Sequence, residues 1–278
     1  MVRKQHLLVD GIPTVAGLML FSDEPQASLP KRSAIKIFRY KTSGCADRDM
    51  LDGVPQTIEG CAYNQIYSAV EQTKRIVDSM KKLGHGLENV SYPTEALHEI
   101  ITNAVIHRDY SIQTDIQIRI FDNRIEVESP GVLPGHITVS NILDEQFSRN
   151  PRIVRLINKF ENPPNKDVGE GLNTAFDAME KLRLKSPEII QNDNSVLVII
   201  KHERLASPEV MVMEYLKDHK SITNAQGRKL TGIKSENIMK NVFIKLREQG
   251  MLRLHGQVWE KIECAELEPE PEQLDLFK

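Results

Sequence analysis

Residues 94–107 read TEALHEIITNAVIH and carry the clearest periodic pattern of this 278-residue chain. We expect a helix that begins near Pro93-Thr94, where the Thr94 hydroxyl can cap it and Glu95 lies at the positive end of the helix dipole. Apolar side chains recur at intervals of three and four and form one buried stripe: Leu97, Ile100, Ile101, Ala104 and Val105. The pattern predicts a helix that packs one face against a core.

Three polar residues lie roughly opposite this stripe. Glu99, Asn103 and His107 are spaced i, i+4 and i+8, so they share one face of the helix. An amide oxygen is a hard ligand that suits Mg²⁺, and a carboxylate one turn away can polarise a water molecule. The same spacing also fits the solvated face of an amphipathic helix, and for an isolated pair this simpler interpretation is the commoner one.

The surrounding segments predict a compact α/β unit over residues 84–206. The expected elements are strands over 115–121 and 124–128, a turn over 129–135, a short helix near 153–158, a helix over 169–184 and a strand over 195–201. Two of these segments carry glycines that could approach a ligand. Gly169, Glu170, Gly171 and Leu172 open a helix, where backbone N–H groups can bind phosphate. The turn with Ser129 and Gly131 could line a nucleotide pocket, although both segments also fit ordinary turns.

The order of these motifs resembles the GHKL superfamily of ATPases, which includes histidine kinases, gyrase, Hsp90 and MutL. Glu99xxxAsn103-Ala104xxHis107 is similar to its N-box, Ser129-Pro130-Gly131 to its first glycine box and Gly169-Glu170-Gly171-Leu172 to its second. A closer resemblance is to prokaryotic Schlafen AlbA_2-domain, RecG-like transcriptional regulators. They combine His-Arg-Asp-Tyr (107–110), Ser-Pro-Gly-x-Leu-Pro (129–134), Ser-Arg-Asn-Pro (148–151) and Gly-Glu-Gly (169–171).

The resemblance covers about residues 7–260 and implies an α+β fold, a Bergerat-type α/β sandwich followed by a winged helix-turn-helix. It implies ATP and Mg²⁺ as ligands. Asn103 would hold Mg²⁺, Glu99 would activate water, and Gly169 and Gly171 would contact phosphates. Arg149 and Asn150 fall in the lid region and could reach the nucleotide. His107 fits either a nucleotide contact or a hydrogen-bonded structural residue.

The chain departs from the superfamily at two positions. Ser129, beside Glu128, stands where an Asp usually hydrogen-bonds the adenine amino group, and a hydroxyl accepts that bond more weakly. Asn173-Thr174 follows the second glycine box, where the closer group often has an Arg. Nucleotide binding without efficient turnover is therefore expected as readily as a weak ATPase activity.

Residues 1–83 are expected to form strands, including 15–21 and 35–40, and a helix over 62–83. Gly11-Ile12-Pro13-Thr14 with the apolar run that follows resembles the closing part of an AlbA_2 domain. We therefore expect a remnant of that domain plus a linking helix, with the earlier part and any nucleic-acid site of it missing.

Residues 207–262 contain ten Lys or Arg against six Asp or Glu, a net charge of +4 in a chain of net charge -3. Their pattern of helix, turn, helix and hairpin predicts a winged helix-turn-helix that binds DNA. The third helix would begin with residues suited to phosphates and base edges: Lys234, Ser235, Asn237, Lys240 and Asn241. The alternative is a dimerisation module.

Residues 263–278 form an acidic tail of net charge -5, which we expect to be disordered. Its end, Gln273-Leu274-Asp275-Leu276-Phe277, resembles the pentapeptide that binds bacterial sliding clamps. Leu276 and Phe277 would be the apolar anchors, and Gln273 would set the orientation. The alternative is that these side chains pack back onto the protein.

Composition excludes several classes of protein. The longest apolar run, 15–21, is far shorter than the roughly 18 residues of a membrane span. Three cysteines without a CxxC motif make a disulfide framework or zinc site improbable and favour the cytoplasm. Three functions stay open: a nucleotide-responsive DNA-binding regulator, an ATPase in DNA transactions, and an adaptor with a degenerate ATP site. A homodimer is an expectation from the resemblance.

Overall fold

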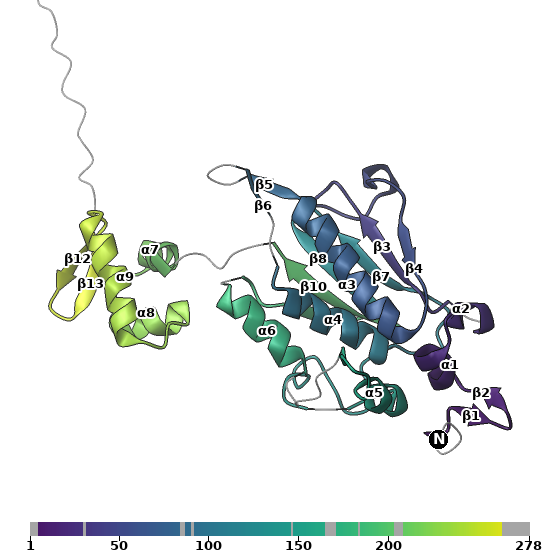
Figure 1. The fold of residues 1–278 in the computed structure, drawn as a ribbon. Helices are drawn as coiled ribbons and strands as arrows, with labels where there is room; N and C mark the ends of the chain where they lie inside the picture. The colour runs from purple at the N-terminus through teal and green to yellow at the C-terminus, as the bar shows by residue number, and fades with distance from the viewer. Residues whose placement is uncertain are drawn as a thin grey trace, which may run out of the picture. The chain divides into compact units, whose positions relative to one another are not determined.

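The computed structural model describes residues 5–29, 32–83, 87–89, 92–145, 147–164, 171–182, 184–202 and 208–262. The chain divides into two compact units, Met1–Leu205 and Ala206–Lys278, which we describe separately (Figure 1). In the part of the chain described, no helix is both long and apolar enough to cross a bilayer.

A six-stranded mixed sheet forms the centre of the first unit (Figure 1). Its strands lie in the order β4-β3-β7-β8-β10-β9, in which β3 and β7 run parallel and every other neighbouring pair is antiparallel. The strand bounds are Ile35–Arg39 for β3, Gln56–Ile58 for β4, Ile116–Ile120 for β7, Arg124–Pro130 for β8, Glu188–Gln191 for β9 and Ser195–Lys201 for β10. The predicted hairpin and the strand over 195–201 are confirmed.

Three helices cover one face of this sheet: α3 (Ala62–Ser79), α4 (Thr94–Ile106) and α6 (Gly171–Lys181) (Figure 1). Alternate strand residues point at them, so Ile116, Ile118 and Ile120 of β7 are fully buried. The predicted stripe of α4 joins the same core. The α+β class is therefore confirmed, as a mixed sheet with helices packed on it.

The start of α4 differs from the prediction. Pro93 is its N-cap residue, and no side chain caps the helix. The backbone carbonyl of Pro93 accepts hydrogen bonds from the N–H groups of Ala96 and Leu97. Thr94 is thus the first residue of the helix, and its predicted role as a cap is wrong.

Smaller elements complete the first unit. They are the hairpins β1/β2 (Leu8–Val9, Ile12–Pro13) and β5/β6 (Lys81–Leu83, Leu87–Asn89), the helices α1 (Val15–Phe21), α2 (Pro25–Ser28) and α5 (Pro151–Ile157), and a 3₁₀ turn over Arg48–Met50.

The apolar run Val15–Phe21 is the helix α1, so the strand predicted there is wrong. Thr14 caps the helix, because its hydroxyl accepts a hydrogen bond from the Gly17 N–H at 3.2 Å. Gly17 packs so closely that a Cβ there would lie 2.4 Å from the Leu7 carbonyl oxygen. A run of seven apolar residues fits a short helix as well as a buried strand. The close contact between Gly17 and Leu7 is a tertiary contact, so the run itself could not reveal it.

Strands β3 and β4 belong to the same sheet as β7, so the compact unit extends across the boundary that we predicted between residues 83 and 84. The parallel pairing of β3 with β7 joins residues about 80 positions apart, for example Ile35 with Ile116. Such pairing leaves no local signal in a sequence.

In the second unit, residues 208–262 form three helices and a three-stranded antiparallel sheet in the order β11-β13-β12. The bounds are Pro208–Asp218 for α7, Ser221–Thr223 for β11, Asn224–Thr231 for α8, Glu236–Glu248 for α9, Leu252–His255 for β12 and Val258–Lys261 for β13. It has its own core, in which the rings of Phe243 and Trp259 stack at 5.2 Å. The three helices and the hairpin that we predicted here are confirmed.

Candidate functional site

A pocket of about 380 Å³ lies in the first unit among α4, strands β8, β9 and β10, the segment 131–148 and the start of α6. Its walls are mainly apolar, and no Lys or Arg is present among the described residues that line it. A small number of polar side chains reach it, including Asn103, His107, Ser129 and Ser148. A largely apolar pocket of this size with few polar groups is typical of a small-molecule site.

Helix α4 presents two of the predicted site residues, Asn103 and His107, to this pocket. The Asn103 amide nitrogen donates a hydrogen bond to the Glu99 carboxylate at 2.8 Å, so its oxygen is left without a partner among the described residues. Glu99 itself is not among the lining residues. Burial raises the pKa of the Glu99 carboxyl, and the hydrogen bond from Asn103 partly opposes this.

His107 ends α4 as its C-cap residue. Its Nδ1 is buried and has no hydrogen-bond partner among the described residues. Burial lowers the pKa of His107 to about 4, and the nearby positive charge of Arg149 acts in the same direction. The ring is therefore neutral at physiological pH and offers an uncharged polar nitrogen at the pocket.

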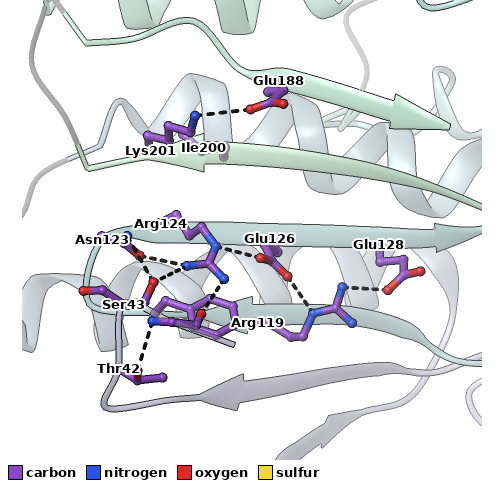
Figure 2. Close-up of polar contacts among 12 residues, drawn as sticks. Thr42, Ser43, Arg119, Asn123, Arg124, Glu126, Glu128, Glu188, Ile200 and Lys201 are labelled. Atoms are coloured by element: carbon purple, nitrogen blue, oxygen red, sulfur yellow. Dashed lines mark hydrogen bonds and ion pairs between the residues drawn. The ribbon is translucent and has the colours of Figure 1, made fainter. Parts of the chain in front are cut away.

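Ser129 lies at the pocket end of β8, and its hydroxyl donates a hydrogen bond to the Ala104 carbonyl at 2.7 Å. That bond uses the hydrogen and leaves the oxygen lone pairs available as acceptors. The neighbouring Glu128 belongs to the opposite face of the sheet, where it accepts a hydrogen bond from Arg119 at 2.6 Å (Figure 2). It also accepts one from Ser195 at 2.6 Å. Ser129 is thus the pocket-facing residue of this pair.

Figure 2 shows how completely the charged side chains on this outer face pair with one another. Arg119 bridges Glu126 and Glu128, and Glu126 also accepts a hydrogen bond from Arg124. These groups satisfy each other on the side of the sheet away from α4, which keeps them out of the pocket.

Gly131 follows β8 in a conformation that excludes other residues. Its φ is 107°, and a Cβ there would lie 2.8 Å from the Cβ of Asp109. The Asp109 N–H donates to the Pro130 carbonyl at 2.7 Å. The turn therefore needs glycine to pack against the end of α4, and this close contact shapes the pocket wall.

Arg149 and Asn150 do not line the pocket. Arg149 forms an ion pair with Asp109 at 3.0 Å and donates to the Val132 carbonyl. Asn150 donates to the carbonyls of Ile106 at 3.0 Å and Arg108 at 2.8 Å. Both side chains tie the start of α5 to the end of α4, and their proposed contact with nucleotide stays a prediction.

The second glycine box lies mostly outside the described residues, which include neither Gly169 nor Glu170. Gly171 begins α6, and Leu172 and Asn173 line the pocket. The Asn173 amide donates to the Leu143 carbonyl at 3.0 Å and so connects α6 to the segment opposite.

Sequence reasoning missed the contribution of residues 136–148, which follow the turn that it expected to line a pocket. Among them are apolar side chains such as Ile137, Leu143 and Phe147, together with the buried hydroxyl of Ser148, which has no hydrogen-bond partner. The described residues of this segment form no helix or strand. Its sequence therefore carries no apolar periodicity from which a contact could be predicted. The Ser-Arg-Asn-Pro motif was the one signal that pointed to this place.

No three His, Cys, Asp or Glu side chains gather as a metal cluster within the described ranges. The predicted Mg²⁺ site would not need one. Mg²⁺ commonly takes one or two protein oxygens, with phosphate oxygens and water supplying the rest, and the partner-free oxygen of Asn103 fits that requirement.

In the second unit, the five residues predicted to meet DNA are all exposed: Lys234, Ser235, Asn237, Lys240 and Asn241. Ser235 also caps α9, because its hydroxyl accepts a hydrogen bond from the Ile238 N–H at 3.4 Å. Helix α8 supports the start of α9 through a hydrogen bond from Arg228 to the Lys234 carbonyl at 3.3 Å. The predicted face is therefore available on a supported helix.

Comparison with known proteins assigns a class to the first unit. Residues 113–200, about a third of the chain, match the HATPase_c_4 family, described as "Putative ATP-dependent DNA helicase recG C-terminal". This part of the chain is therefore an ATPase-like domain. The match contains β7 to β10 and begins after α4.

A similar fold occurs in the crystal structure of the DIP2311 protein from Corynebacterium diphtheriae. The TM-score is 0.58 at 21% sequence identity, and the match covers 94% of this chain and 56% of that one. The chain thus spans little more than half the length of that protein. No curated protein matches the chain.

Proposed function

We propose that this protein is a DNA-binding regulator whose first unit binds Mg-ATP in the pocket beside α4, and that the bound nucleotide modulates DNA binding by the second unit. The observation that carries the proposal is the pocket of about 380 Å³ that Asn103 and Ser129 line. The ATPase-like match of residues 113–200 supports the choice of nucleotide.

In this proposal the fold is of Bergerat type. Asn103 would hold Mg²⁺ through its free amide oxygen, and Ser129 would accept a hydrogen bond from the adenine amino group through its lone pairs. Backbone N–H groups of Gly169 to Leu172 would contact the phosphates. The bound Mg²⁺ would supply charge neutralisation of the phosphate oxygens.

Calorimetric titration of Mg-ATP tests the nucleotide site. The intact chain should bind, and Asn103→Ala should lower the affinity at least tenfold. Asn237→Ala is the matched control, because it removes an exposed amide from α9 and should leave ATP affinity unchanged. An intact chain that binds no ATP would contradict the proposal and favour an adaptor with a degenerate site.

For the second unit we propose a winged helix-turn-helix in which α9 enters the major groove of DNA. Its support is the net charge of +4 over 207–262 and the five exposed polar and basic residues at the start of α9. Lys234 and Lys240 would contact phosphates, and Asn237 and Asn241 would face base edges.

Fluorescence anisotropy with a duplex DNA pool tests this assignment. Lys240→Ala should weaken binding and reduce the salt dependence by about one counterion. Lys220→Ala, between α7 and β11, is the charge-matched control. If both variants weaken DNA binding equally, α9 is not the recognition helix. If the second unit self-associates and has no affinity for DNA, it is a dimerisation module. Affinity measured with and without ATP tests the modulation.

A second candidate is an ATPase that acts in DNA transactions. The observation that favours it is Glu99, a carboxylate of raised pKa one turn from Asn103, which would polarise water in this role. Steady-state phosphate release should then vanish in Glu99→Gln and persist in Glu95→Gln, an exposed glutamate of the same helix. Binding of ATP without phosphate release would favour the regulator.

Recruitment to a sliding clamp belongs to this second candidate. The tail that carries Gln273, Leu274, Leu276 and Phe277 lies outside the described residues, so this proposal rests on sequence. Deleting 273–278 should abolish retention on an immobilised bacterial clamp, whereas Glu270→Gln with Glu272→Gln should not. Retention that survives the deletion would contradict it.

A further inference from the structure

Two buried polar atoms at the pocket have no hydrogen-bond partner within the part of the chain that the structure describes. The Ser148 hydroxyl and Nδ1 of His107 both lie out of contact with solvent, without a hydrogen bond, and both residues line the pocket. Burial of an unpaired polar group costs free energy, so nearly all such groups in folded proteins find a partner. Two of them beside one pocket point to a ligand that supplies the missing hydrogen bonds once the Ser148 and His107 side chains rotate toward it.

The surroundings indicate which part of a ligand this is. The described lining contains the carboxylate of Glu145 but no Lys or Arg, and apolar side chains such as Ile142, Val154 and Val198 dominate it. Arg149, next to Ser148 in the chain, is engaged by Asp109 and the Val132 carbonyl. This part of the pocket therefore suits an uncharged ring system with polar edges, and phosphate groups would gain no charge partner from the described lining.

The protonation state of His107 agrees with that assignment. Since its pKa is lowered to about 4, the ring is neutral at pH 7 and adds no positive charge for a phosphate. It can exchange a hydrogen bond with a hydroxyl, ring nitrogen or amino group.

We infer that Ser148 and His107 hydrogen-bond the nucleoside, the uncharged base and sugar of the nucleotide, which makes Ser148 a further binding residue of the site. This inference rests on the proposed nucleotide function. It adds a contact from the segment opposite α4, so the bound nucleoside would join 132–148 to the end of α4.

The test compares Mg-ATP with adenosine, which lacks phosphates, in titrations of the full chain. Ser148→Ala should lower both affinities by a similar factor, about five- to tenfold, as expected for one lost hydrogen bond. Ser140→Ala is the matched control, because Ser140 belongs to the same segment, is exposed and does not line the pocket. His107→Leu should also weaken both ligands.

Thermal unfolding without ligand provides an independent readout. Because the Ser148 hydroxyl has no partner in the free protein, Ser148→Ala should leave Tm unchanged or raise it. A lowered Tm would assign the hydroxyl to the fold instead and overturn the inference.

The outcomes separate the two proposals. If the intact chain binds neither ATP nor adenosine, the proposed function fails. If it binds ATP but Ser148→Ala binds both ligands as the intact chain does, or loses affinity for ATP alone, only the nucleoside assignment fails. ATP binding by an intact chain that shows none for adenosine would also overturn the assignment.

Discussion

Among the residues that the structure describes, Arg108 has the largest side chain that is completely buried. One nitrogen of its guanidinium donates to the carbonyls of Arg32 at 3.0 Å, Thr114 at 2.8 Å and Ile112 at 3.4 Å. These acceptors precede β3 and β7, so a residue next to His107 holds two strand starts near the end of α4. The His-Arg-Asp-Tyr motif thus contains a residue that supports the fold beside one that faces the pocket.

Replacing Arg108 should therefore destabilise the first unit. Arg108→Ala leaves three carbonyls without their donor and opens a cavity, and we expect a loss of about 3 kcal/mol in the free energy of unfolding by urea. Arg75→Ala, which breaks an exposed pair with Glu71, should change it by less than about 0.5 kcal/mol. Equal effects of the two substitutions would refute this role of Arg108.

The lowered pKa of His107 predicts a pH dependence of stability. Below its ordinary value of 6.5 the unfolded chain binds a proton there, whereas the folded chain does so only near pH 4. The unfolded state therefore binds more protons in this window, and stability falls as the pH drops from about 7 to 4. In His107→Leu, the free energy of unfolding should fall by up to about 3 kcal/mol less between pH 7 and pH 4 than in the unchanged protein. Parallel pH profiles of the two proteins, measured by denaturant unfolding, would contradict it.

At the scale of elements, the turn after β8 combines a positive φ with a close packing contact at Gly131. Gly131→Ala should cost about 2–4 kcal/mol of stability and weaken ligand binding, because the added Cβ meets Asp109 at 2.8 Å. Gly53→Ala is the control: it has a φ of 78° but nothing within 4 Å of the added Cβ. It should cost only the backbone strain, about 1 kcal/mol. Similar losses in both variants would mean that packing at Asp109 contributes nothing.

At the scale of the whole molecule, the two units have separate cores. Phe243→Ala removes a buried ring that stacks on Trp259 and should destabilise the second unit by about 3–5 kcal/mol. Hydrogen exchange should then rise over 208–262 and stay unchanged over 92–145. The ATP affinity should persist. Faster exchange in both ranges would reveal that the two units depend on each other.

Local patterns predicted the elements whose signals are local. The stripe of α4, the hairpin of β7 and β8, the strand β10 and the three helices of the second unit follow from apolar periodicity and turn residues within a few positions. Of the three residues predicted to share one face of α4, Asn103 and His107 line the pocket and Glu99 does not. Element ends were less accurate, since Pro93 rather than Thr94 caps α4.

The sequence by itself thus determined the α+β class, the helix that carries Asn103 and His107, and the basic C-terminal unit, because each depends on residues close together in the chain. Only the tertiary structure decided that Val15–Phe21 is a helix, that β3 pairs with β7, and that Arg149 engages Asp109 while Ser148 lines the pocket. Those features depend on contacts between residues far apart in sequence. Their partners become neighbours only when the sheet and its helices have packed.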